Sequence, residues 1–271
     1  ELTDDHPVVD LKLLARRNFW TGTVAMAVAY SLFMGNLVLL PLWLQQFMGY
    51  TSTQAGMLMA PVGLFAIILS PVVGKNISKF DPRSLTTFAF AVFALVLFMR
   101  SHFNTQADFG TIMVPTIIQG VAVAFFFIPL TSIILGGIPP EKIPSASGLS
   151  SFARMVGGSF GTSIAITIWQ DRAALHHAQL AELVNRGSSA TTSALAGFNA
   201  GGMSTEQALS QINRMVDQQA FMLAANDVFY GSAIIFVLLV PLVWLARPAS
   251  RSVGAPTSGS AGAADAAAGA H

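Results

Sequence analysis

The chain has 271 residues, of which 53% are hydrophobic and only 10% are charged. A soluble domain usually has about 25% charged residues, and a soluble fold this poor in charge could not cover its surface, so the composition favours lipid as the solvent. The formal net charge of +1 argues against nucleic acid as a partner, which is bound through clustered Lys and Arg, and the lack of cysteine excludes disulfides and thiolate metal sites.

The first segment, residues 1–18, is polar and has no basic stretch followed by an apolar core, so it is not a signal peptide. The chain begins with Glu1 rather than Met, and charged residues directly precede the first hydrophobic run. We therefore interpret the chain as a piece of a longer protein, with residues 1–18 as a cytoplasmic lead-in. The alternative is an expressed fragment that simply starts here.

Six hydrophobic runs are long enough, or nearly so, to cross a membrane as helices, which takes roughly 20 residues for a core about 30 Å thick. They are too long for barrel strands and lack a period of two. The prolines inside them are tolerated in membrane helices, where neighbours satisfy the freed carbonyls. The sequence therefore predicts an all-α membrane protein with one six-helix domain, residues 19–247, whose spans cover 19–41, 52–74, 84–100, 109–137, 146–170 and 228–246.

The basic residues near the ends of these runs predict an orientation, because cytoplasmic loops carry an excess of Lys and Arg. The opposite short connections, 45–51 and 101–108, contain neither residue, and Arg100 stands at the boundary of the second. Alternating spans thus place both ends of the chain in the cytoplasm. The residues on this side are Lys12, Arg16, Arg17, Lys75, Lys79, Arg83, Lys142, Arg247 and Arg251.

A long polar connection, residues 171–227, falls on the other side. Residues 172–185 are rich in Ala and Leu and are expected to form a surface helix, whereas 187–202 has the composition of a loop. Ser204 and Gln207 have the spacing of a capping box, as Thr51 and Gln54 do before the second span, and predict a helix that runs into the last span. The tail, 248–271, is rich in Ala, Gly and Ser and is expected to be disordered.

Several motifs resemble one transporter family. Residues 49–56 (GYTSTQAG), followed by 61–63 (PVG) and 70–74 (SPVVG), resemble the second helix of the C-terminal half of a major facilitator. The next residues resemble the cytoplasmic loop motif of that superfamily, G-x-x-x-D-R-x-G-R. Gly74, Lys79 and Arg83 fit this motif, whereas Ser78 stands where an acid is usual and Asp81 where Gly is usual.

A second set of residues resembles a narrower group. Residues 146–149 (ASGL), Arg154 and 157–161 (GGSFG) resemble the penultimate helix of the fourteen-helix drug/proton antiporters of the EmrB/QacA type. The resemblance implies the six-helix C-terminal half of a proton-coupled multidrug exporter that works by alternating access in the bacterial inner membrane. It further implies membrane lipid, small amphipathic substrates, protons, a missing N-terminal half and a periplasmic adaptor protein as partners, and no cofactor.

Other functions stay open. The same fold fits an exporter of a specific metabolite, siderophore or lipid, and a membrane scaffold that transports nothing is a third interpretation. An enzyme is not expected, because the sequence has no G-x-x-x-x-G-K-[ST], H-E-x-x-H or G-x-S-x-G motif. No acidic residue lies deep in a predicted span, so the carboxylate that proton coupling requires is expected in the missing half.

The candidate substrate path follows from the resemblance, because the first and fourth helices of each half line the path in that fold. Asn36 and Gln119 are polar residues in the middle of these spans, and hydrogen bonding between helices is their alternative role. Tyr30 and Phe33 would add an aromatic wall near Asn36. Phe126 belongs to a soft apolar surface of Phe and Met residues that adapts to varied ligands, although lipid contact or core packing is the more common role of any single residue of this kind.

Arg154 is the only charge well inside a predicted span, and such a charge is expensive unless it faces the bundle interior or a cavity. Its alternative is to snorkel towards the cytoplasmic headgroups. Gly157 and Gly161 form a G-x-x-x-G pair, which permits close approach of another helix. His176 and His177 are adjacent and make a poor chelate, so these two residues, with Asp171 and Asp227, are expected to be solvated and no metal site is predicted.

Overall fold

The computed structural model describes residues 11–77, 79–184 and 188–246. Every regular element in this part of the chain is helical, which confirms the predicted fold class. The predictions for residues 1–10, Ser78, Arg186, Arg247, Arg251 and the tail lie outside the described residues. The elements are η1 (Leu11–Ala15), α1 (Arg17–Phe47), α2 (Ser52–Asn76), α3 (Pro82–Arg100), α4 (Phe109–Leu135), η2 (Pro140–Lys142), α5 (Ile143–Leu183), α6 (Ser189–Ala200) and α7 (Thr205–Trp244).

Local sequence signals set the starts of these helices. The capping boxes predicted at Thr51 and Ser204 are both present, with the side-chain oxygen accepting from the third residue of the helix and the Gln side chain accepting from the cap. Asp81 caps α3 by accepting from the backbone N–H of Arg83, and Pro82 occupies the first helical position. The departure from the family's loop motif at Asp81 therefore has a local reason, since a carboxylate is a better N-cap than glycine.

Five helices of the described chain are long and apolar enough to cross a membrane, namely α1, α2, α3, α4 and α7. The helix that contains the predicted fifth span, α5, is not in this group. Its central part carries Arg154 and many Gly, Ser and Thr residues, which lower its hydropathy although the helix is long enough. The count of six spans therefore stays a prediction, with α5 as the member in question.

The helices pack in two layers. One layer is a row in which α2 contacts α4, α4 contacts α1, and α1 contacts α5. The other layer is formed by α3 and α7, which contact each other, and α3 also packs on α4 while α7 packs on α5 and α1. The aromatic core lies between the layers, where Phe90 and Phe93 of α3 meet Phe126 of α4 and Phe236 of α7. One side of the row is therefore covered by α3 and α7.

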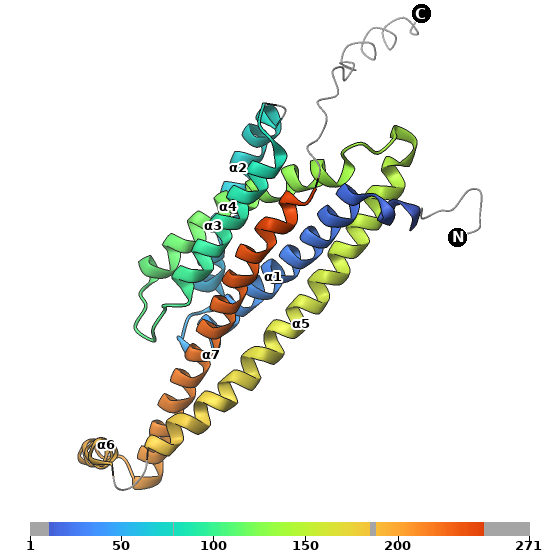
Figure 1. The fold of residues 1–271 in the computed structure, drawn as a ribbon. Coiled ribbons are helices and arrows are strands. Elements are labelled where there is room, and N and C mark those ends of the chain that lie inside the picture. The colour runs from blue at the N-terminus through green and yellow to red at the C-terminus, as the bar shows by residue number, and fades with distance from the viewer. Residues whose placement is uncertain (1–10, 78, 185–187, 247–271) are drawn as a thin grey trace, which may run out of the picture.

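The two ends of the bundle differ. The start of α1, the end of α7, the α2–α3 turn and the α4–α5 connection lie at one end (Figure 1). There the Arg16 Nη1 donates to the carbonyl oxygen of Gly137 at 2.6 Å, which joins the start of α1 to the connection before α5. The predicted cytoplasmic cations Lys75, Lys79 and Lys142 belong to the same end, so the described basic segments share one side of the bundle.

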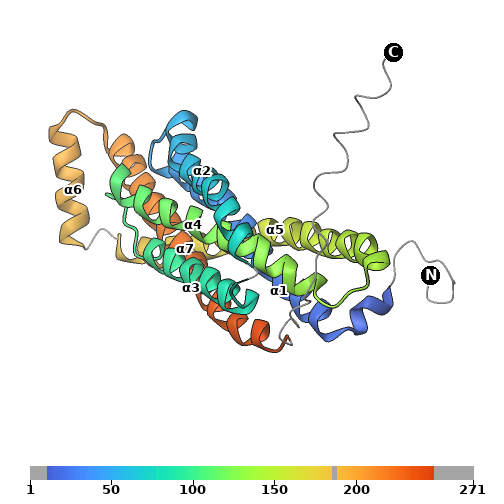
Figure 2. The ribbon, with the colours of Figure 1, turned by 90° about the horizontal axis from the view of Figure 1, so that it is seen from above.

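At the other end, α5 and α7 run past the remaining helices and form a hairpin with α6 at its tip (Figures 1 and 2). The 41 residues of α5 correspond to about 62 Å at 1.5 Å per residue, twice the thickness of a hydrocarbon core. The helix expected over 172–185 is present, but it is the continuation of α5, which runs without a break to Leu183. The prediction of a loop over 187–202 is wrong for Ser189–Ala200, where the Ser188 side chain caps an Ala-rich helix.

Candidate functional site

Two helix pairs in the row approach each other without space for side chains. A Cβ added to Gly157 would lie 2.7 Å from the carbonyl oxygen of Ala27, and one added to Gly161 would overlap the hydroxyl and carbonyl oxygens of Ser31. At the other end of the row, a Cβ added to Gly120 would lie 2.7 Å from the carbonyl oxygen of Pro61. Glycines thus bring α5 against α1 and α4 against α2, and each pair packs as a unit.

A cation and two aromatic rings meet on three helices of the row. The guanidinium carbon of Arg154 in α5 lies 5.6 Å from the ring centroid of Tyr30 in α1 and 5.9 Å from that of Phe127 in α4. The centroids of the two rings are 6.1 Å apart, and the ring planes are inclined by 66°. All three side chains are half-buried. We call Tyr30, Phe127 and Arg154 the cation–aromatic cluster, and this geometry is that of a cation–π interaction.

Phe33 and Phe126, predicted on the substrate path, lie in the core instead of this cluster. Phe33 stacks edge-on against Phe93 of α3, and Phe126 does the same at 5.8 Å from that ring. Sequence reasoning missed Phe127 because three consecutive Phe residues do not indicate which side of the helix is buried. Adjacent residues of a helix point about 100° apart, so only the packing decides that Phe126 faces α3 while Phe127 contacts Arg154.

Asn36 is buried in α1 and has one unsatisfied atom. Its Nδ2 donates to the Leu32 carbonyl oxygen at 2.7 Å and to the Ser232 Oγ of α7 at 3.1 Å. Its Oδ1 is buried without a partner in the described part of the chain. Asn36 and Ser232 line a cavity of about 280 Å³ between α1, α5 and α7, with Arg172 and Asp227 also in its wall. Asn36 therefore forms the interhelical bond considered from the sequence and also borders a cavity.

Gln119 receives a hydrogen bond from a cation that the sequence did not single out. The Nη2 of Arg100, the last residue of α3, donates to Gln119 Oε1 at 2.7 Å and to Thr116 Oγ1 at 3.2 Å, both on α4. Arg100 is 0% exposed, and its Nε and Nη1 have no partner among the described residues. Helical side chains tilt towards the N-terminus of their helix, so Arg100 points back into the bundle although it ends the helix.

We expect Arg100→Met to destabilise the full-length protein less than Arg100→Ala. Alanine leaves a cavity, which costs about 2–5 kcal/mol for large core residues, whereas methionine keeps most of the volume and removes a buried charge that has only neutral partners. The melting temperatures of the two variants in detergent, measured side by side, test the order. A Met variant as unstable as the Ala variant would show that the charge itself holds α3 on α4.

The three residues of the cytoplasmic loop motif do not form one cluster. A Cβ on Gly74 would meet nothing within 4 Å, and Lys79 is exposed. Arg83 is only 8% exposed, and its Nε and Nη2 are buried without partners among the residues described. Of the three residues, only Arg83 has a side chain buried in the bundle. The role of the motif stays a prediction.

The histidine pair, predicted as solvated surface, bridges two helices. His176 Nε2 lies 2.8 Å from Asp227 Oδ2, and His177 Nε2 lies 3.3 Å from Asp217 Oδ1. Arg172 is 3.9 Å from the same carboxylate of Asp227. These contacts join α5 to α7 at the base of the hairpin. No group of three or more His, Asp or Glu in the described residues is placed to hold a metal ion.

Comparisons of the sequence with a family model and with known proteins agree on one family. The sequence pattern of the Major Facilitator Superfamily matches residues 4–162. The chain is 46% identical over 252 residues to the multidrug export protein EmrB of Escherichia coli K12, which covers 92% of this chain and 49% of the relative. It is 40% identical over 254 residues to the fatty acid resistance protein FarB of Neisseria gonorrhoeae, covering 94% and 50%.

A more distant relative is the lincomycin resistance protein LmrB of Listeria innocua, which is 26% identical over 168 residues and covers 62% of this chain and 36% of the relative. The chain thus spans about half the length of the curated relatives that it matches most extensively. The residues of the cation–aromatic cluster lie within the matched part of the chain.

Proposed function

Since this chain belongs to the major facilitator superfamily and is a multi-pass membrane transporter chain, we propose that it is the C-terminal half of a proton-driven exporter of small amphipathic molecules. The observation that carries the proposal is the cation–aromatic cluster, in which α1, α4 and α5 each contribute one side chain. A flat aromatic surface beside a polar group suits ligands that have an apolar body and one polar end.

The surfaces of α2 and α5 support a missing second half. Of the five apolar helices, α2 is the least buried, and it exposes Leu64, Ile67 and Ile68. The N-terminal half of α5 exposes Phe152, Met155 and Phe160. These two helices lie at the two ends of the row, so a second bundle packed along the row would contact both. Their exposed apolar side chains therefore fit an interface with the N-terminal half, with lipid as the alternative cover.

The glycine contacts support the mechanism of the proposal. Because α5 is locked on α1 and α4 on α2, each pair would move as one body when the two halves rock around a central cavity. Among the acidic residues of the described chain, Asp81 and Asp108 are helix caps, whereas Asp227 lies in the middle of α7 and is exposed beside Arg172 and His176. We therefore expect the proton-binding carboxylate in the N-terminal half, and we expect the termini of this half to be cytoplasmic.

A specific observation favours a second substrate class. The charge in the cluster is positive, and a guanidinium binds carboxylates through paired hydrogen bonds. One relative is named for fatty acid resistance. The same site could therefore carry amphipathic anions such as fatty acids, in which case the polar end of the substrate would contact Arg154 and its chain would lie along Tyr30 and Phe127.

Transport by the full-length protein tests the proposal. Purified protein in inverted vesicles with an imposed proton gradient is expected to accumulate tetraphenylphosphonium, and an excess of laurate competes if anions share the path. Empty vesicles and vesicles without a gradient are the controls. Gradient-dependent uptake of neither compound would contradict the exporter and favour the membrane scaffold.

A further inference from the structure

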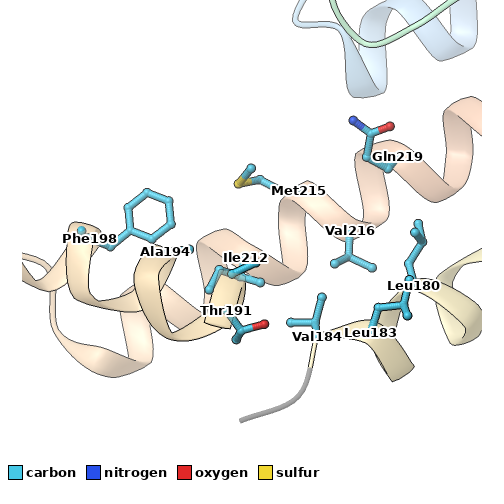
Figure 3. A pocket seen from close by; sticks show the side chains of 12 residues that line it. Leu180, Leu183, Val184, Thr191, Ala194, Phe198, Ile212, Met215, Val216 and Gln219 are labelled. Carbon is cyan, nitrogen blue, oxygen red and sulfur yellow. The ribbon is translucent and has the colours of Figure 1, made fainter. Parts of the chain in front are cut away.

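The tip of the hairpin forms a large apolar cavity that is open on one side. It has a volume of about 620 Å³ and lies between the end of α5, the whole of α6 and the first turns of α7 (Figure 3). Leu180, Phe198, Ile212 and Met215 supply most of the visible wall, and Thr191 and Gln219 are the polar side chains. None of the described residues that line the cavity is charged.

The cavity lies at and beyond the outer ends of the spans. Gln218 Nε2 donates to the carbonyl oxygen of Phe47, the last residue of α1, at 2.7 Å. Gln219 Nε2 donates to Thr105 Oγ1, in the connection between α3 and α4, at 3.0 Å. These bonds fasten α7 at the level where the other helices end, and most of the cavity residues lie further out along the hairpin. The cavity therefore faces water, unlike the apolar surfaces of α3 and α7 that face lipid.

Exposing apolar surface to water costs about 25 cal/mol per Å². A ligand that covers the apolar lining of the cavity therefore lowers the free energy of the protein. Its volume falls within the range of small-molecule sites, which are mostly apolar with a few polar groups. The floor is protected, since Thr191 and Ile212 are each 9% exposed, while Met215 at the mouth is 52% exposed. An unbranched methionine at the mouth can adjust to ligands of different shape.

The surroundings favour a compact ligand over a protein partner. Gln179, Asn213 and Arg214, which neighbour lining residues in the sequence, are polar and exposed. Polar residues thus border the hollow, and other exposed apolar side chains of the hairpin, such as Met203 and Leu209, do not line it. A concave apolar hollow with a few polar groups fits a compact ligand. The absence of charge in the described lining disfavours phosphates and other strongly hydrated anions.

We propose that this cavity is a second ligand site of the exporter, which binds the apolar body of an amphipathic molecule on the outer side of the membrane. The 26 residues of α5 from Arg154 to Leu180 separate it from the cation–aromatic cluster by about 39 Å. A molecule released from the central cavity would be held here in water before it leaves. This inference rests on the proposed function for the origin of the ligand, but binding itself does not require transport.

Cysteine protection tests the site directly, because this half has no cysteine of its own. Ala194→Cys places a thiol in the wall of the cavity, and Ser193→Cys places one on the adjacent, exposed position of α6 that does not line it. Both are made in the full-length protein, free of other reactive thiols, and are labelled with a charged maleimide. We expect tetraphenylphosphonium and N-phenyl-1-naphthylamine to slow labelling of the first variant about tenfold and leave the second unchanged.

A second experiment places a charge at the mouth of the cavity and repeats the labelling. Met215→Glu in the Ala194→Cys background should abolish protection by N-phenyl-1-naphthylamine, the neutral probe, because a carboxylate at the mouth disfavours an apolar ligand. Leu209→Glu is the matched control, since it is on the same helix, is 46% exposed and does not line the cavity. Unchanged labelling with both compounds, equal protection of the Ser193→Cys control, or protection by N-phenyl-1-naphthylamine that survives Met215→Glu would each overturn the inference.

The outcomes separate this inference from the proposed function. Transport without protection would leave the exporter standing and remove the outer site. Protection without gradient-driven transport would support the outer site and contradict the exporter.

Discussion

Replacing Gly161 with alanine is expected to lower the stability of the full-length protein by about 1–3 kcal/mol, the usual cost of overpacking a well-packed site. The added methyl group would overlap the hydroxyl and carbonyl oxygens of Ser31, and a backbone carbonyl cannot turn away as a flexible side chain can. The helices α1 and α5 would have to separate, and Gly35, whose Cβ would approach the Gly161 carbonyl at 3.0 Å, would lose its contact as well. Thermal unfolding in detergent measures the effect.

Gly148→Ala is the matched control for this prediction. Gly148 lies on the same helix, and a Cβ there would meet nothing within 4 Å, so alanine should be neutral or slightly stabilising because it favours helix. If both variants unfold at the same temperature, the close approach of α5 to α1 does not contribute to the stability of the fold.

Replacing Arg154 with alanine is expected to reduce transport by the full-length exporter at least tenfold, whereas Arg172→Ala should have a mild effect. Arg154 lies over two rings that belong to α1 and α4, so its loss removes a cation–π interaction and the polar end of the cluster. A partly desolvated interaction of about 1.4 kcal/mol corresponds to a factor of ten. Initial rates of gradient-driven uptake in vesicles provide the measurement.

Arg172 is a suitable comparison because it is on the same helix and its side chain is 53% exposed. Its distance of 3.9 Å from Asp227 makes it a surface ion pair of the kind that contributes little. Equal and mild losses in the two variants would contradict a role for the cluster in transport. Arg154→Lys adds a further readout, because a lysine keeps the charge but not the planar group that stacks on aromatic rings.

The sequence was sufficient for features that depend on neighbouring residues. Helices were predicted from the length of the apolar runs, and the structure places a helix over each of the six. The capping boxes at Thr51 and Ser204 were predicted from spacing alone, because a cap and its partner are three residues apart and interact whatever the rest of the chain does. The tolerance of prolines inside the apolar helices also agrees with the structure, since α1, α2, α4 and α7 each contain at least one.

Features that depend on which side of a helix faces which neighbour were decided only by the tertiary structure. In an apolar helix nearly every residue is hydrophobic, so no amphipathic pattern marks the buried side, and the burial of Phe126 and the exposure of Phe127 to Arg154 could not be told apart. The buried position of Arg100 was missed for a related reason, since a cation at a helix end normally reaches the water. Its burial depends on α4 presenting Gln119 and Thr116 to it.

The amino-acid sequence by itself therefore determined the fold class, the helix starts at Thr51 and Ser204 and the family of this protein, because these follow from composition, short-range spacing and local motifs. The tertiary structure decided the cation–aromatic cluster, the choice of α1 as the helix that contacts Gly157 and Gly161, and the hairpin of α5, α6 and α7 with its cavity. Each of these joins residues that are far apart in the chain. Packing between helices selects them, and packing energies depend on three-dimensional fit, which a single sequence does not encode in any local pattern.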